Sequence, residues 1–217
     1  NIAIGTGALC ANFVGCLNIA LGCNALNSLA QGCNNVAIGF CASGNSLSSC
    51  NNIAIGYLAA FCTSGNNNVA IGAATLIGNT TGSDNTAIGM LSLTNNATGS
   101  SNVAIGSNTL LANIAGSNNT AIGYNALTAN TTGGANIAVG QASMESNTIG
   151  VNNIAVGPGS LQTNTTGKQN IAIGYQSGYQ NNNSLTLYVA VGAGTNTIAT
   201  SSDGITWTGK SNTIFTN

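Results

Sequence analysis

Charge is almost absent from this sequence. Its 217 residues include two lysines and three acidic residues, with no His and no Arg, so the net charge is −1. Because nothing could neutralise phosphates, we exclude nucleic acid as a partner. Three scattered carboxylates without His leave almost no acid–base or metal chemistry, so we predict that the protein is not an enzyme and needs no cofactor or metal.

Long hydrophobic runs are absent as well. Gly or Asn interrupts every apolar stretch before it approaches the ~18 residues of a membrane-spanning helix, so we predict no membrane insertion. Apolar residues nevertheless make up 43% of the chain and fall at fixed intervals, which excludes an intrinsically disordered chain.

A block of the form Asn-(Ile/Val/Thr)-Ala-(Ile/Val/Leu)-Gly recurs eleven times, at intervals of seventeen residues with one interval of sixteen. Such strict self-similarity predicts a stack in which each repeat forms one rung. Positions within a rung are numbered from its opening Asn. The rungs begin at Asn1, Asn18, Asn35, Asn52, Asn68, Asn85, Asn102, Asn119, Asn136, Asn153 and Asn170.

Each rung has the consensus N-I-A-I-G-x-x-(A/S/T)-L-x-x-N-T-T-G-x-x. The opening block alternates with the period of a strand, and we predict that positions 2 and 4 face the core. The invariant Ala at position 3 indicates that two layers of backbone approach closely. Gly at position 5 is expected to turn the chain with positive φ, a second short strand is expected at positions 8 and 9, and Asn-Thr-Thr-Gly is expected to form an outer turn.

Stacking these rungs in register predicts an all-β fold, a parallel β-solenoid on the order of 50 Å long with strands ~4.8 Å apart. The Asn residues of position 1 are predicted to stack as a structural amide ladder along it. Each rung buries few large apolar side chains, and their burial only roughly offsets the conformational entropy lost when seventeen residues are ordered. One narrow coil is therefore expected to be marginally stable. We therefore predict a homotrimer in preference to a wider monomeric coil.

The repeat blocks also resemble known families. NVAIG and NTAIG resemble the head repeats of trimeric autotransporter adhesins, and residues 119–135 resemble the repeats of viral and bacterial tail-fibre proteins. The resemblance covers residues 1–185 and implies a left-handed β-roll. The chain departs from the adhesin heads in its longer unit of seventeen residues and in its cysteines.

Residues 186–217 leave the repeat and form the second predicted unit. Residues 188–209 resemble a unit of giant-virus proteins, and their SSDGITW segment resembles the Asp-box hairpin of β-propellers. The resemblance implies a short β-hairpin module with a purely structural turn, at the start of a further module of a longer protein. The matching residues are Ser201, Asp203, Gly204 and Trp207.

All seven cysteines lie within the first 62 residues. Cys16, Cys33 and Cys50 share position 16, so they are predicted to stack on one edge at a spacing that suits disulfides. Buried thiols that only fill space, and a metal site without His, are the alternatives. The other disulfide candidates are the pair Cys23 and Cys41, with Cys10 and Cys62.

Three further features bear on the surface. The sequons at position 12 are expected on the outer turn, where either a row of glycans or turn chemistry explains them. A file of Thr at positions 13 and 14 is typical of ice-binding solenoids, and aromatics at position 6 favour corner packing over sugar stacking. The glycosylation candidates are Asn79, Asn96, Asn130 and Asn164 at position 12, with Asn118 and Asn182 elsewhere. The aromatics are Phe40, Tyr57, Tyr124 and Tyr175.

These observations predict the shaft or head of a fibre on a virion or in the extracellular space. Its partners would be further copies of itself and a host-surface glycan or receptor, which many weak contacts would hold together. The alternatives are a purely structural filament, an ice-binding solenoid and, with the least support, a hydrolase with a cleft around Asp203.

Overall fold

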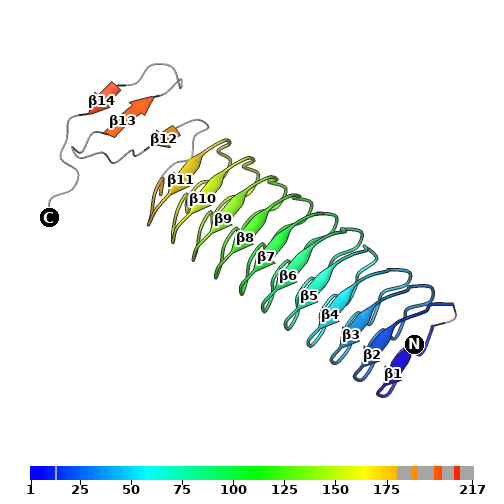
Figure 1. Ribbon diagram of the computed structural model, residues 1–217. Coiled ribbons are helices and arrows are strands. Elements are labelled where there is room, and N and C mark those ends of the chain that lie inside the picture. Colours follow the sequence, from blue (N-terminus) through cyan, green and yellow to red (C-terminus); the bar gives the residue numbers. More distant parts are fainter. Residues whose placement is uncertain (13, 180–186, 190–197, 202–207, 211–217) are drawn as a thin grey trace.

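The computed structural model describes residues 1–12, 14–179, 187–189, 198–201 and 208–210. Its rungs form a straight rod with one short strand each, lying side by side in chain order (Figure 1). The predicted parallel β-solenoid is therefore confirmed, and the described residues contain no helix that could span a membrane. The strands of the rod are β1 (Ile2–Ile4), β2 (Ile19–Leu21), β3 (Val36–Ile38), β4 (Ile53–Ile55), β5 (Val69–Ile71), β6 (Thr86–Ile88), β7 (Val103–Ile105), β8 (Thr120–Ile122), β9 (Ile137–Val139), β10 (Ile154–Val156) and β11 (Ile171–Ile173).

Every strand of the rod pairs with the next in strict parallel register, so equivalent residues are direct neighbours. Ala104 of β7, for example, pairs with Ala121 of β8. The register survives the one short interval, because Ile53 of β4 still pairs with Val69 of β5. The missing residue falls in the turn before Gly65, where the chain absorbs it outside the sheet.

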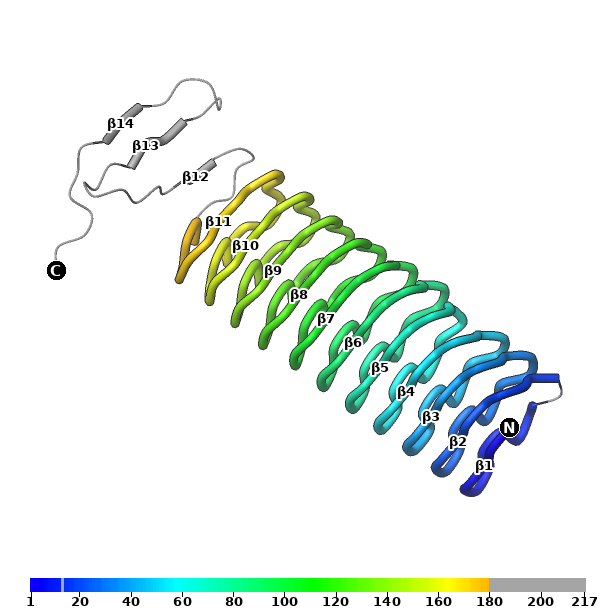
Figure 2. Tube along the Cα trace, viewed as in Figure 1, coloured from blue at the N-terminus to red at the C-terminus, as the bar shows by residue number. Residues whose placement is uncertain are grey.

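The chain trace turns once around the coil in each rung (Figure 2). Backbone hydrogen bonds between rungs also continue outside the strands. On the wall opposite β7, Leu110 N donates to Ala126 O at 3.1 Å, and Ala112 N donates to Thr128 O at 3.0 Å. The predicted second strand at positions 8 and 9 is wrong. Leu110 has a φ of 49°, which lies in the left-handed region and breaks an extended conformation.

The interior of the coil is built from small residues and, in most rungs, one large apolar residue at position 9. Ala104 and Leu110 are fully buried, whereas Ile105 keeps 37% of its surface exposed. The prediction that positions 2 and 4 form the core is therefore wrong: alternation along the strand points them outward when Ala points inward. The close approach of two layers does occur, since Ser92 Oγ on one wall donates to Ala104 O on the other at 3.0 Å.

Beyond the rod, the pairing of strands changes. β12 (Leu187–Val189) pairs in parallel with β11, whereas β13 (Ile198–Ser201) and β14 (Thr208–Lys210) pair antiparallel. Ser201 ends β13 opposite Leu187. The other three Asp-box candidates, Asp203, Gly204 and Trp207, lie outside the described residues.

Candidate functional site

An apolar face runs the full length of the rod on the outer side of strands β1 to β11. Positions 2 and 4 of all eleven strands project from this face, and each holds Ile, Val or Leu except at Thr86 and Thr120. The side chains shield one another along the rod, but none is covered from above. Ile122 in the middle of the rod remains 37% exposed, and Ile4 and Ile173 near its ends remain 60% and 70% exposed.

Position 6 forms a file along one edge of this face, immediately after the corner Gly. Phe40, Tyr57, Tyr124 and Tyr175 are all largely exposed there, so the interpretation that they pack within the corner is wrong. The rings of Phe40 and Tyr57 stack on each other with centroids 5.6 Å apart and an angle of 11° between planes. The exposed edges of these rings are accessible to a ligand.

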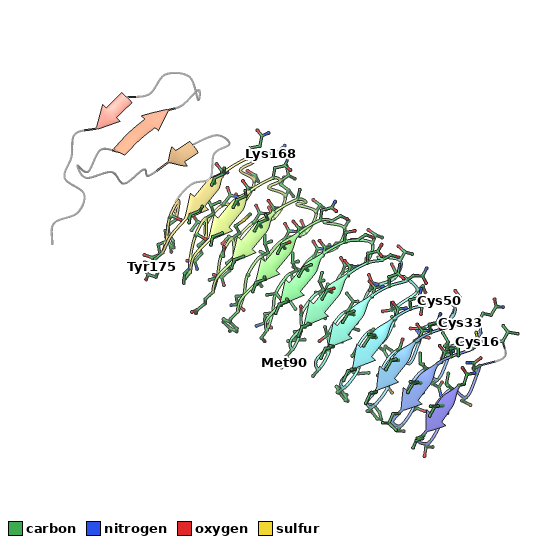
Figure 3. All side chains as sticks on the ribbon, viewed as in Figure 1. Cys16, Cys33, Cys50, Met90, Lys168 and Tyr175 are labelled. Carbon is green, nitrogen blue, oxygen red and sulfur yellow. The ribbon has the colours of Figure 1, made fainter. Side chains whose placement is uncertain are left out.

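Position 16 forms the file along the opposite edge, where Figure 3 shows Cys16, Cys33, Cys50 and Lys168. In the middle of this file each side chain accepts the backbone N–H of the preceding rung. Ser83 N donates to Ser100 Oγ at 3.1 Å, as Cys33 N donates to Cys50 Sγ at 3.3 Å. In the first seven rungs position 16 therefore holds small acceptors, which are thiols in three rungs, Asn66 in the fourth and Ser in the next three. Gly, Val and Lys168 occupy the position farther along.

The seven cysteines are all free in the structure, and those at position 16 include two whose sulfur atoms are in contact. Cys16 Sγ and Cys33 Sγ lie 2.8 Å apart. Cys23 and Cys41 lie in adjacent rungs and are joined by a backbone hydrogen bond, in which Cys41 N donates to Cys23 O at 2.9 Å. Within the described residues, no group of three His, Cys, Asp or Glu side chains is arranged to hold a metal ion.

Asn at position 1 forms a buried amide ladder inside the coil. Asn102 is fully buried, and both its backbone N and its Nδ2 donate to Asn85 Oδ1, at 3.0 and 3.1 Å. The same Nδ2 donates to Gly116 O at 2.8 Å. Each amide therefore bonds its own rung to the preceding one, and it also joins the first residue of its rung to the Gly at position 15 of the same rung.

Asn at position 12 forms a second buried ladder, which the sequence pattern did not lead us to expect. Asn113 Nδ2 donates to Asn96 Oδ1 at 2.7 Å and to Gly116 O at 2.9 Å, so both ladders converge on one carbonyl. Asn113 and Asn147 occupy position 12 without a sequon, and this was the signal that Asn serves the fold there.

This ladder corrects the glycosylation prediction for four of the six candidates. Asn79, Asn96, Asn130 and Asn164 are fully buried, and their Nδ2 atoms, to which a glycan would be attached, donate hydrogen bonds. The turn itself lies at the surface, since Thr80 and Thr81 are exposed, but the expectation that its Asn side chains point outward is wrong, and the folded coil cannot carry glycans on them. Asn118 is exposed and stays a candidate, and Asn182 lies outside the described residues.

A neutral cleft of about 280 Å³ opens near the N-terminal end of the rod. Gly44 at position 10 leaves a gap there between Asn27 and Phe61 of the neighbouring rungs. The lining is made of amides, a hydroxyl, a thiol and one aromatic ring, with no charged side chain. Such neutral hydrogen-bonding groups beside a ring suit a small uncharged ligand better than they suit acid–base catalysis.

No protein-family model matches this chain, and neither a curated protein nor a solved structure shows a significant match.

Proposed function

We propose that this chain is a segment of a structural and adhesive fibre on a virion or in the extracellular space, in which three copies pack through their apolar sheet faces. The single observation that supports this most is the file at position 4, where Ile, Val or Leu lies on the outer side of every strand from β1 to β11. Soluble monomers rarely leave a long contiguous apolar surface uncovered.

Further copies of the same chain are the occupant that this face fits best. The face is straight, repeats at every rung and carries no charged residue, so an identical face complements it along the full length of the rod. Closed rotational symmetry is the usual arrangement of identical chains, and a threefold axis lets three narrow faces enclose one apolar core. The two polar amide ladders stay inside each coil.

Sedimentation equilibrium of the full chain tests this assembly. We expect a trimer for the wild type and monomers for the double variant Ile105→Asp and Ile122→Asp, because burying two new carboxylates against Ile is unfavourable. The matched control is Ile114→Asp, since Ile114 is 50% exposed but belongs to the turn at position 13. A wild type that is monomeric at all accessible concentrations would contradict the proposal.

Adhesion would use the surfaces that such a bundle leaves free. Exposed aromatic side chains recur along the position 6 file, and the cleft beside Phe61 has neutral polar walls. Both features favour a host-surface glycan as the partner, bound weakly at many points. A glycan array would detect this binding, and Phe40→Ser with Tyr57→Ser should weaken it more than Met90→Ser, an exposed control in the same file. No binding by an intact trimer would leave a purely structural filament as the function.

Ice binding has less support. Thr131 Oγ1 and Thr148 Oγ1 each donate to the carbonyl of position 13 in the next rung at 3.0 Å, so these hydroxyl protons are not available to order water. Ile114 and Ile149 also interrupt the file with exposed apolar side chains. Thermal hysteresis in solution would revive this alternative.

A further inference from the structure

The first three rungs place thiols in a column at position 16. Cys16 Sγ and Cys33 Sγ are 2.8 Å apart, and Cys16 N donates to Cys33 Sγ at 3.3 Å. Cys33 N donates in turn to Cys50 Sγ at 3.3 Å. Cys16 is exposed and Cys33 is half-buried, so small reagents reach both sulfurs from solvent.

We propose that Cys16 and Cys33 form a thiol–disulfide exchange site that reacts with low-molecular-weight disulfides and cross-links the first two rungs within one chain. In-register rungs keep the Cα atoms of equivalent residues ~4.8 Å apart, within the range that a disulfide spans. The two sulfurs already touch, so bond formation needs only a small movement of the side chains.

Structural need alone does not account for sulfur at this position. Farther along the same file, Ser100 Oγ and Ser117 Oγ accept the N–H of the preceding rung at 3.1 and 3.0 Å, which is the role of Cys33 and Cys50. A hydroxyl therefore serves the backbone as well as a thiol does. What the thiols add is the ability to form a covalent bond.

The two thiols are not equivalent, which assigns the order of reaction. The hydrogen bond from the Cys16 thiol, together with that from Cys16 N–H, lowers the pKa of Cys33. The pKa of Cys16 is raised, chiefly by the same side-chain hydrogen bond and secondarily by burial. As pH rises, Cys33 therefore becomes a thiolate first, and the thiolate is the attacking form.

The reaction balances in two exchange steps. The Cys33 thiolate attacks a small disulfide RSSR, forming Cys33–S–SR and releasing RS⁻. Cys16 then loses its proton to solvent and attacks the Cys33 sulfur, forming the Cys16–Cys33 bond and releasing a second RS⁻. One RSSR is reduced to two thiols, and two protein thiols are oxidised to one disulfide.

The cross-link would reinforce the least regular part of the rod. Position 12 holds Asn12, Leu29, Ser46 and Thr63 in the first four rungs, so the second amide ladder starts only at Asn79. Three buried polar atoms in this region, Asn12 Nδ2, Ser49 Oγ and Thr63 Oγ1, have no hydrogen-bond partner among the described residues. A covalent link between rungs would offset these missing hydrogen bonds.

Peptide mapping of the full chain tests the site. The protein is equilibrated with reduced and oxidised glutathione, its free thiols are blocked, and it is digested with pepsin at low pH to prevent exchange. Pepsin replaces trypsin because no Lys or Arg precedes Lys168. We expect the Cys16–Cys33 peptide to be the most abundant cross-link, lighter than its reduced halves by the mass of two hydrogens.

Three serine variants make the result specific. Cys33→Ser should abolish the cross-link, Cys16→Ser should instead accumulate glutathione on Cys33, and Cys50→Ser, the matched control in the next rung, should leave the Cys16–Cys33 peptide unchanged. Ser already occupies position 16 at Ser83, Ser100 and Ser117, so the variants should retain the wild-type circular dichroism spectrum.

Several outcomes would overturn the proposal. Failure of Cys16 and Cys33 to cross-link in a folded wild type is one, and a dominant Cys33–Cys50 peptide is another. In a mixture of ¹⁴N- and ¹⁵N-labelled chains, a hybrid peptide would show that the bond joins two chains. If Cys33→Ser does not fold, glutathione on Cys33 in Cys16→Ser still decides the question, and its absence would contradict the assigned order.

Discussion

At the scale of single residues, each of the first ten rungs holds two or three residues other than glycine in the left-handed region of φ. In the seventh rung these include Asn108, Leu110 and Asn118, with φ of 57°, 49° and 60°. Asn occupies this region at little cost, whereas for Leu it costs about 1–2 kcal/mol. Leu110 is fully buried, so burial of a large apolar side chain offsets its unfavourable backbone conformation.

Replacing Leu110 with Ala should lower the free energy of unfolding by about 2–5 kcal/mol, because it leaves a cavity where the seventh rung has its one large apolar core side chain. Leu111→Ala is the matched control, since Leu111 is adjacent in sequence but only half-buried. Urea denaturation monitored by circular dichroism measures both. Equal losses in the two variants would contradict the assignment of position 9 to the core.

At the scale of the rung, the corner glycines allow successive coils to lie directly on one another. Gly123 has a φ of 128°, and a Cβ there would lie 2.7 Å from the carbonyl carbon of Gly140 in the next rung. Gly174 has nearly the same φ of 124°, but among the described residues no atom lies within 4 Å of a Cβ placed there. A side chain at Gly174 would therefore meet backbone strain alone among the described residues, whereas a side chain at Gly123 would meet both backbone strain and a clash with the next rung.

Gly174→Ala should cost only the strain of the backbone, of order 1–3 kcal/mol, whereas Gly123→Ala should cost clearly more because two backbones would have to separate. Thermal unfolding of the two variants against the wild type makes the comparison. If both variants melted at the same temperature, contact between stacked corners would not be what requires Gly at position 5.

At the scale of the whole molecule, the rod is held together by contacts between neighbouring rungs. The side-chain amide of Asn102, for instance, donates hydrogen bonds to Asn85 in the preceding rung and to Gly116 in its own. Stability should therefore be nearly a sum of equal increments along the rod. The shorter interval of sixteen residues between Asn52 and Asn68 also shows that a turn can lose a residue while the strands keep their register.

Deleting residues 102–118, one complete rung, should give a folded rod that is shorter by ~4.8 Å, because Thr86 would then pair with Thr120 as equivalents. Deleting residues 102–110 should instead prevent regular stacking, since it removes β7 and leaves half a coil. Small-angle X-ray scattering and circular dichroism distinguish the two. A whole-rung deletion that unfolds the protein would show that its contacts are not confined to neighbours.

The interval of seventeen residues determined the stack by itself. Equivalent residues that recur at a constant spacing can all have the same neighbours only when each rung lies on the one before it. This stacking sets the parallel pairing of β1 to β11. The need for Gly at position 5 was readable for a similar reason, because the invariant residue was the one that tolerates positive φ.

Only the tertiary structure decided which side of each strand lies inside the coil. Alternation defines two faces but does not say which one is enclosed, and hydrophobicity favoured Ile122 over Ala121 as the core residue. The coil is so narrow that a methyl group fills the space between its walls, and the larger side chains must therefore lie outside. The same enclosure buries Asn130, whose sequon suggests a surface position, because its amide is needed to bond the rungs beneath the turn.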